Sequence, residues 1–121
     1  MGRKILLIDD NAQDRKIMER FLKKAGYEEI VTAETGEEGV EKARAGDFDL
    51  VVSDTVLPGI DGFEVCRRIR EARGAGSPKI IITTGAIDAV NAVKAKKMGA
   101  DDYCAKTTDA VPLIEAVKKL I

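Results

Sequence analysis

The sequence predicts an α/β protein in which five strands alternate with five helices, a (βα)5 doubly wound parallel sheet. Short apolar runs rich in isoleucine, leucine and valine recur along the chain, and such runs are typical of strands buried on both faces of a parallel sheet. Segments with the period of an amphipathic helix lie between them. This alternation indicates βαβ units, whose right-handed crossovers place helices on both faces of the sheet.

Five runs of strand length define the predicted strands. They cover residues 5–8, 30–33, 50–53, 80–83 and 102–105. The last run is the most polar of the five and gives the weakest signal. The connections are only a few residues long and include no linker, repeat or low-complexity tract. We therefore expect one domain over residues 1–121.

Capping residues predict where the helices begin and end. A capping side chain followed three residues later by an acid predicts helix starts near residues 12, 36 and 62. The caps are Asn11, Thr35 and Asp61. Glycines suited to a left-handed C-terminal residue follow four helical segments; these are Gly26, Gly46, Gly74 and Gly99. Asp109 is the predicted cap of the last helix, with Pro112 in its first turn.

Apolar stripes predict which side of each helix faces the sheet. The first helix carries Ile17, Met18, Phe21 and Leu22; the third Val65, Cys66 and Ile69; the fourth Val90, Val93 and Met98; the last Val111, Ile114, Val117, Leu120 and Ile121. Cys66 and Cys104 lack the spacing of a metal or redox motif. We expect both to be buried, reduced thiols.

Composition narrows the class of protein. Apolar residues make up 45% and charged residues 34% of the chain, as in ordinary globular proteins. The 20 basic and 21 acidic residues nearly cancel. No basic field attracts nucleic acid, so we expect no direct contact with it. No apolar run approaches the roughly 18 residues of a membrane span, which predicts no membrane contact and a cytoplasmic protein.

Polar side chains follow four of the predicted strands at the point where each ends. Asp9 and Asp10 follow the first strand, Asp54 the third, Thr84 the fourth and Lys106 the fifth. The carboxyl ends of parallel strands meet at one edge of the sheet, where open α/β folds place their functional groups. Three carboxylates there would repel one another unless a cation lay among them. Mg²⁺ (or Mn²⁺) is the natural occupant, because it takes oxygen ligands and keeps waters for a phosphorylated substrate.

Each of these residues also has a simpler interpretation. The acidic pair can favour the positive end of the first helix, although Asn11 is better placed to cap it. Asp54 can bind the backbone of its own turn, and Thr84 and Lys106 can be ordinary residues at strand ends. Together, however, a carboxylate nucleophile, a hydroxyl, an ammonium and a bound metal are the groups needed to receive and hold a phosphoryl group.

Four stretches of the chain resemble, in order, the receiver domains of two-component response regulators, the CheY-like family. They are residues 5–11 with the acidic pair, residues 54–62, the dipeptide Thr84-Gly85, and residues 99–106 with Tyr103 and Lys106. The spacings are similar to those of the family over essentially the whole chain. The resemblance implies a flavodoxin-like sheet with strand order 2-1-3-4-5 and a single receiver domain over residues 1–121.

The resemblance also implies a role for each site residue. Asp54 would accept a phosphoryl group from the phosphohistidine of a sensor histidine kinase or a histidine phosphotransfer protein. Asp10, Asp54 and the Val56 carbonyl would bind Mg²⁺ directly, and Asp9 would act through water. Lys106 would neutralise a phosphoryl oxygen. Such a protein is not an enzyme in the ordinary sense, although it assists its own phosphorylation and dephosphorylation.

Signal output is implied in the same way. Thr84 would move toward the phosphoryl group and Tyr103 would turn inward, which would change the surface made by the fourth helix, the fifth strand and the fifth helix. A downstream target protein would bind that face. This would be a shift between two existing populations.

The chain departs from the family pattern after the lysine. The family usually has proline there, often with a cis peptide bond, whereas this chain has Thr107. A cis bond without proline costs roughly 3 kcal/mol, so we expect a trans Lys106–Thr107 bond and an altered loop. Val56 and Ala86 occupy the positions that flank the phosphoryl group, and neither side chain can orient a water. We therefore expect slow hydrolysis of the phosphorylated protein.

Two alternatives stay open from the sequence. The chain can be a receiver fold that serves as an interaction module without phosphorylation, although all the site residues are present. A flavodoxin-like cofactor binder would need a phosphate-cradling first loop and more aromatic residues than the 4% found.

The sequence leaves a second question open for a receiver. The chain can be a single-domain regulator or a receiver taken from a longer protein.

Overall fold

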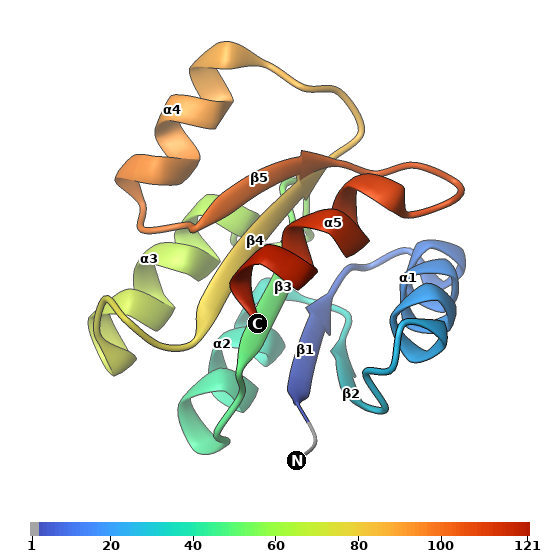
Figure 1. The fold of residues 1–121 in the computed structure, drawn as a ribbon. Coiled ribbons are helices and arrows are strands. Elements are labelled where there is room, and N and C mark those ends of the chain that lie inside the picture. Colours follow the sequence, from blue (N-terminus) through green and yellow to red (C-terminus); the bar gives the residue numbers. More distant parts are fainter. Residues whose placement is uncertain (1–2) are drawn as a thin grey trace.

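The computed structural model, which describes residues 3–121, is a five-stranded parallel sheet covered by helices on both faces (Figure 1). The strands are β1 (Lys4–Ile8), β2 (Glu29–Ala33), β3 (Leu50–Asp54), β4 (Lys79–Thr84) and β5 (Asp102–Ala105). The helices are α1 (Ala12–Lys24), α2 (Gly36–Ala45), α3 (Gly62–Arg73), α4 (Ala89–Lys97) and α5 (Val111–Leu120). The strand order is β2-β1-β3-β4-β5, so the predicted fold is confirmed.

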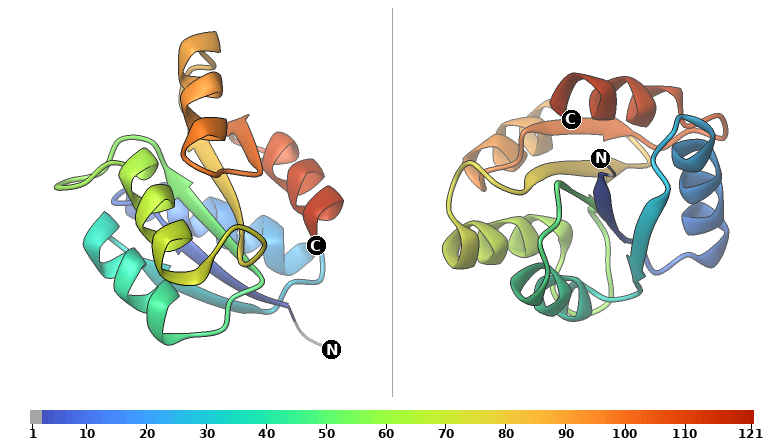
Figure 2. Two further views of the ribbon diagram at one scale, coloured as in Figure 1. Left: turned by 90° about the vertical axis from the view of Figure 1, so that its left-hand side faces the viewer. Right: turned by 60° about the horizontal axis from the view of Figure 1, so that its bottom comes forward.

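Two apolar clusters hold the layers together, one on each face of the sheet. Alternate residues of the central strands point to opposite faces: Leu6 and Ile8 join the cluster under α2, α3 and α4, whereas Ile5 and Leu7 join the cluster under α1 and α5. The central strands are almost completely buried. Figure 2 shows α4 standing out beside β5 at one edge of the sheet.

The register of the strands sets which residues meet at the carboxyl edge. Ile8 of β1 lies opposite Ser53 of β3, so the residues that follow, Asp9 and Asp54, come level with each other. Thr84 of β4 lies opposite Ala105 of β5. Lys106 therefore emerges at the same edge, and its backbone N–H donates to the Thr84 carbonyl at 2.7 Å.

The three predicted helix starts are confirmed. Asn11, Thr35 and Asp61 each accept a hydrogen bond from the backbone N–H three residues on, at 2.9, 3.1 and 2.9 Å. The acids at those third positions make other contacts. Glu64, for example, pairs with Arg67 and Arg68. Only the N-cap half of each capping pattern forms.

Two capping predictions are wrong. Gly26, Gly74 and Gly99 have the expected positive φ, but Gly46 has φ −114° and ends α2 in an extended conformation. The N-cap of α5 is Ala110 (φ 55°) rather than Asp109. Asp109 forms a tight turn just before the helix, where its carboxylate accepts from Thr107 Oγ1 at 2.7 Å and from the Val111 N–H at 3.1 Å.

The predicted buried face of the fourth helix is also wrong. Val90 and Val93 are 77% and 55% exposed, and Ala95 is the buried residue of α4. In α5, Leu113, Ala116 and Val117 are buried, whereas Val111 is 47% exposed. At the edge of the sheet α4 packs mainly against β5 and α3, which leaves Val90 and Val93 exposed.

Smaller predictions agree with the structure. Cys66 and Cys104 are free and buried. Within residues 3–121, the one cis peptide bond is Ser77–Pro78, so Lys106–Thr107 is trans as expected. None of the helices described is long and apolar enough to cross a membrane.

Substitution of Gly62 tests the close approach of α3 to β3. An alanine Cβ at this first residue of α3 would collide with the Asp54 carbonyl oxygen and lie 3.2 Å from the Thr55 Cα. We expect Gly62→Ala to lower the free energy of unfolding by about 1–3 kcal/mol, as overpacking does. Denaturant unfolding measures this. Gly76→Ala is the control, because a Cβ there meets nothing within 4 Å; equal stability of the two variants would contradict the packing argument.

Candidate functional site

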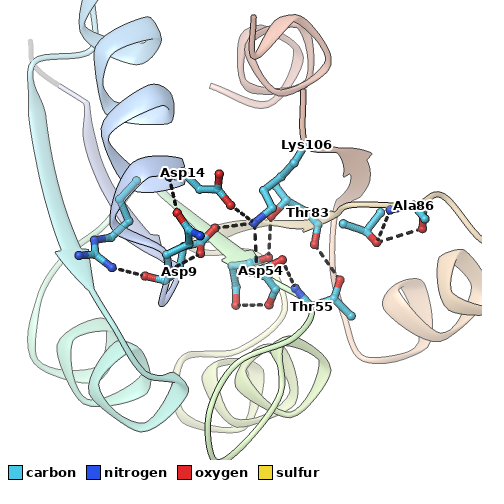
Figure 3. Close-up of polar contacts among 11 residues, drawn as sticks. Asp9, Asp14, Asp54, Thr55, Thr83, Ala86 and Lys106 are labelled. Atoms are coloured by element: carbon cyan, nitrogen blue, oxygen red, sulfur yellow. Dashed lines mark hydrogen bonds and ion pairs between the residues drawn. The ribbon is translucent and has the colours of Figure 1, made fainter. Parts of the chain in front are cut away.

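Three carboxylates gather at the carboxyl edge of the central strands (Figure 3). Asp9, Asp10 and Asp54 each offer an oxygen atom, and these atoms all lie within 4.8 Å of one another. Asp9 is completely buried, the side chain of Asp54 is 12% exposed and Asp10 is open to solvent. One side of the cluster is therefore covered by protein and the other faces water.

Lys106 brings the positive charge to this cluster from the end of β5. Its Nζ lies 2.9 Å from Asp9 Oδ2 and 3.2 Å from Asp54 Oδ2. It also lies 2.8 Å from Asp14 Oδ2. Figure 3 shows the ammonium surrounded by these three carboxylates. The lysine is thus the main counter-charge in the part of the site that the structure describes.

The electrostatic environment of Asp54 is unfavourable for its charged form. Burial raises the pKa of Asp54, and the neighbouring Asp9 carboxylate raises it further, although Lys106 and the Thr55 N–H act in the opposite direction. For Lys106 burial opposes the charge, but hydrogen bonds to Asp14 and Asp9 outweigh it and raise the pKa of the ammonium. The lysine therefore stays charged, and the carboxylates remain short of positive charge.

The loop after β3 is held tightly against its neighbours. The Thr55 N–H donates to Asp54 Oδ1 at 2.9 Å, and Thr55 Oγ1 donates to the Thr83 carbonyl at 2.7 Å. The Gly62 N–H donates to the Thr55 carbonyl at 2.9 Å. These bonds connect Asp54 to both β4 and the start of α3, so the orientation of its carboxylate is defined by the fold.

The remaining predicted site residues surround the carboxylates on the α4 side. The Thr84 hydroxyl donates to the Ala86 carbonyl at 3.0 Å and accepts from the Ala86 N–H at 3.2 Å. It therefore makes a local turn in this structure. Val56 is 76% exposed, and Ala86 is also exposed. Both side chains therefore face solvent.

Tyr103 lies on β5, beside a groove of about 380 Å³ between α4 and β5. The residue is half-buried. Its hydroxyl oxygen is buried and has no hydrogen-bond partner among residues 3–121. The inward turn of Tyr103 on phosphorylation, which the resemblance implies, stays a prediction.

Asp14 is the site residue that the sequence reasoning did not identify. The pattern around Asn11 accounted for Asp14 as a capping partner in the first turn of α1. The structure sends its carboxylate to Lys106 instead. Its position in the sequence could have identified it, because an acid in the first turn of α1, just after Asp9 and Asp10, lies at the same edge of the sheet.

The geometry suits a hard divalent cation. Three carboxylates within reach of one point, two of them sheltered and one facing solvent, offer the oxygen ligands that Mg²⁺ takes. Burial and the Asp9 carboxylate raise the pKa of Asp54 by more than Lys106 lowers it. A bound cation would supply further positive charge, and the open side leaves room for waters or phosphoryl oxygens.

Comparison with known proteins identifies the family. The chain matches the response regulator receiver domain over residues 5–118. It is 36% identical to the transcriptional regulatory protein ResD of Bacillus subtilis over 118 residues, which are 98% of this chain and 48% of ResD. It is 42% identical to the transcriptional regulatory protein AfsQ1 of Streptomyces coelicolor over 102 residues, 84% of this chain and 44% of AfsQ1. The chain spans about half the length of these curated relatives.

Solved structures agree. The response regulator TrrA of Thermotoga maritima, in complex with Mg²⁺ and BeF, has a TM-score of 0.87 at 37% identity and covers 98% of this chain and 99% of its own. The chemotaxis protein CheY4 of Vibrio cholerae has a TM-score of 0.91 at 26% identity, with 100% of both chains covered. The protein is an α/β receiver with an acidic site at the carboxyl edge of its sheet. It belongs to the receiver domain family of two-component response regulators.

Replacement of Asp54 tests the crowding of carboxylates. In metal-free buffer we expect Asp54→Asn to raise the melting temperature by a few degrees. Because the pKa of Asp54 is raised in the folded state, folding takes up a proton between the ordinary Asp pKa of about 3.9 and the raised pKa, so stability falls as pH rises through that interval and then levels off. The advantage of the variant is therefore small near pH 4, grows through that interval and is constant above it. Thermal unfolding followed by circular dichroism measures it.

The matched control is Asp47→Asn, which removes an equal charge from a side chain that is 98% exposed. It should leave the melting temperature nearly unchanged. Mg²⁺ at 100 times the wild-type Kd should stabilise the wild type by about 2.7 kcal/mol and Asp54→Asn by less. An advantage of Asp54→Asn that shrinks as pH rises would contradict the account.

Proposed function

We propose that Asp54 accepts a phosphoryl group from a phosphohistidine of a sensor histidine kinase or a histidine phosphotransfer protein, in a reaction that depends on Mg²⁺ (or Mn²⁺). The observation that carries the proposal is the position of Asp54. It ends β3 within 4.8 Å of two further carboxylates, and Lys106 Nζ lies 3.2 Å away. An interaction module that is not phosphorylated would have no need to keep this crowded and unfavourable arrangement.

The proposed transfer is a displacement at phosphorus. An Oδ atom of Asp54 forms the new bond, and the P–N bond to the donor imidazole breaks, so that the electron pair stays on the leaving nitrogen. Negative charge is spread over the three equatorial oxygens during transfer. Lys106 is close enough to neutralise one of them, and the Thr84 hydroxyl can donate to another after it leaves Ala86.

The cation would be held by the residues around Asp54. We assign direct ligation to Asp10, Asp54 and the Val56 carbonyl, and a contact through water to Asp9, whose buried carboxylate already accepts from Asn11 and Lys106. Mg²⁺, when bound, supplies positive charge to the carboxylates and to the oxygens of the transferred group. The relative TrrA was solved in complex with Mg²⁺ and BeF, which supports a divalent cation in the site of this chain.

The output of the domain is proposed to lie on the face made by α4, β5 and α5, where a target protein would bind. Val90 and Val93 are exposed there, next to the groove beside Tyr103. A buried hydroxyl without a partner costs about 1–3 kcal/mol, so the position of Tyr103 in this structure depends on stabilising contributions from elsewhere. Movement of Thr84 toward a phosphoryl group would make room for the ring to turn inward, which would shift the population of the two states.

The proposed functional unit is a single domain. We assign residues 1–121 to one receiver domain. The curated relatives are about twice as long, and as transcriptional regulators they combine a segment of this kind with other segments. Whether this domain acts alone or with an attached partner, phosphorylation at Asp54 would be the input.

Phosphorylation with a small donor tests the proposal. With acetyl phosphate and Mg²⁺, intact mass spectrometry should show one phosphoryl adduct on the wild type and on Asp47→Asn. The adduct should be absent from Asp54→Asn and disappear when the metal is chelated. A wild-type protein that forms no adduct and binds no Mg²⁺ would instead be the interaction module without phosphorylation.

Phosphate lifetime should depend on Val56. Its side chain cannot orient an attacking water, so we expect slow loss of the aspartyl phosphate and a loss at least several-fold faster in Val56→Asn. The decay of the adduct measured by mass spectrometry reports the rate. Val90→Asn is the matched control, because Val90 is 77% exposed against 76% for Val56 and lies on α4. Equal decay in both variants would contradict the assignment of Val56.

A further inference from the structure

A fourth carboxylate holds the lysine of the site. Asp14 Oδ2 lies 2.8 Å from Lys106 Nζ, nearer than Asp9 at 2.9 Å or Asp54 at 3.2 Å. An ammonium has three N–H donors, so the three carboxylates account for all of them. Asp14 differs from the other two because it is outside the group of carboxylates, among residues 3–121, that can share a cation.

Helix capping does not explain where the Asp14 side chain goes. The Asp14 N–H is already satisfied by Asn11 Oδ1 at 2.9 Å. A reciprocal cap would send the Asp14 carboxylate back to the Asn11 N–H, but that N–H donates to Asp9 Oδ1 at 2.9 Å. The backbone at the start of α1 is therefore complete without the Asp14 carboxylate, which is free to reach across to the end of β5.

The contact is stronger than an ordinary surface ion pair. Exposed pairs contribute about 0–1 kcal/mol. Here the Lys106 side chain is only 19% exposed and Asp14 is 37% exposed, so solvent screens the pair less. Burial opposes the charge on Lys106, but the hydrogen bonds to Asp14 and then Asp9 raise its pKa. The ammonium is thus held from the α1 side by a group that has no other partner among the described residues.

Binding of a cation would affect the three contacts of Lys106 differently. Asp9 and Asp54 would turn part of their charge toward the cation, whereas Asp14 would keep its hydrogen bond. We propose that Asp14 is a positioning residue, which keeps the Lys106 ammonium beside Asp54 so that its other donors meet the incoming phosphoryl oxygen. This inference rests on the proposed function. Asp14 acts through Lys106 and touches neither the cation nor the phosphoryl group.

Loss of Asp14 has two expected consequences. Lys106 then pairs more closely with Asp9 and Asp54, so it competes with the cation and weakens Mg²⁺ binding several-fold. The ammonium also loses its fixed position, and phosphorylation by acetyl phosphate slows about tenfold, within the roughly 10²-fold that a misplaced group can cost. Asp14→Asn keeps the shape of the side chain, but its neutral amide oxygen is a weaker acceptor for the Lys106 ammonium. Asp14→Ala removes the acceptor and should have the larger effect.

The test combines adduct formation followed by mass spectrometry with calorimetric titration of Mg²⁺ alone. Asp47→Asn is the charge-matched control and should behave as the wild type in both measurements. The decisive background is Lys106→Met, in which Asp14→Asn should no longer change the Mg²⁺ affinity. Melting temperatures are measured alongside, because a purely structural role would lower them without changing the Mg²⁺ affinity.

The outcomes separate this inference from the proposed function. An equal phosphorylation rate for Asp14→Asn and Asp47→Asn would overturn the positioning role. So would an unchanged Mg²⁺ affinity in Asp14→Asn, or an effect on affinity that persists in Lys106→Met, since Asp14 would then act on the metal directly. A wild-type protein that takes no phosphoryl group would overturn the proposed function itself, and this role with it.

Discussion

Repulsion among carboxylates at one edge of the sheet is the constraint on which the rest of the site depends. Parallel pairing of β1 with β3 brings Asp9 level with Asp54, and burial together with the nearby Asp9 carboxylate raises the pKa of Asp54. Relief comes from Lys106, which lies 97 residues from Asp9 in the sequence. An ion pair therefore connects residues from near the two ends of the chain. A divalent cation would neutralise the negative charge that Lys106 leaves uncompensated.

The same edge connects the site to the rest of the fold. Asp54 is tied through Thr55 to the carbonyl of Thr83 on β4, and the next residue, Thr84, accepts from the Lys106 N–H. A change of charge at Asp54 would therefore act first on a short, hydrogen-bonded segment that leads to α4. That helix is weakly covered, with Val90 and Val93 exposed, so it could move with little loss of packing by these two side chains.

The strand and helix order, the three N-caps and the convergence of Asp9, Asp54 and Lys106 could all be predicted from the sequence, because they follow from local periodicity and from the geometry of parallel sheets. The failures have tertiary causes. The apolar residues of α4 recur with the period of a helix, but the edge of the sheet offers too little surface to bury Val90 and Val93. Ala110 replaced Asp109 as the cap because the Thr107 turn shifted the start of α5. Asp14 was missed because its partner comes from the far end of the chain.

The central claim is that the buried, crowded carboxylate of Asp54 is the one that becomes phosphorylated. Borohydride reduction of the phosphorylated protein converts an acyl phosphate to the corresponding alcohol, and peptide sequencing by tandem mass spectrometry then locates it. We expect homoserine at position 54, with Asp9, Asp10 and Asp14 unchanged. Homoserine at one of those three positions, with Asp54 intact, would contradict it.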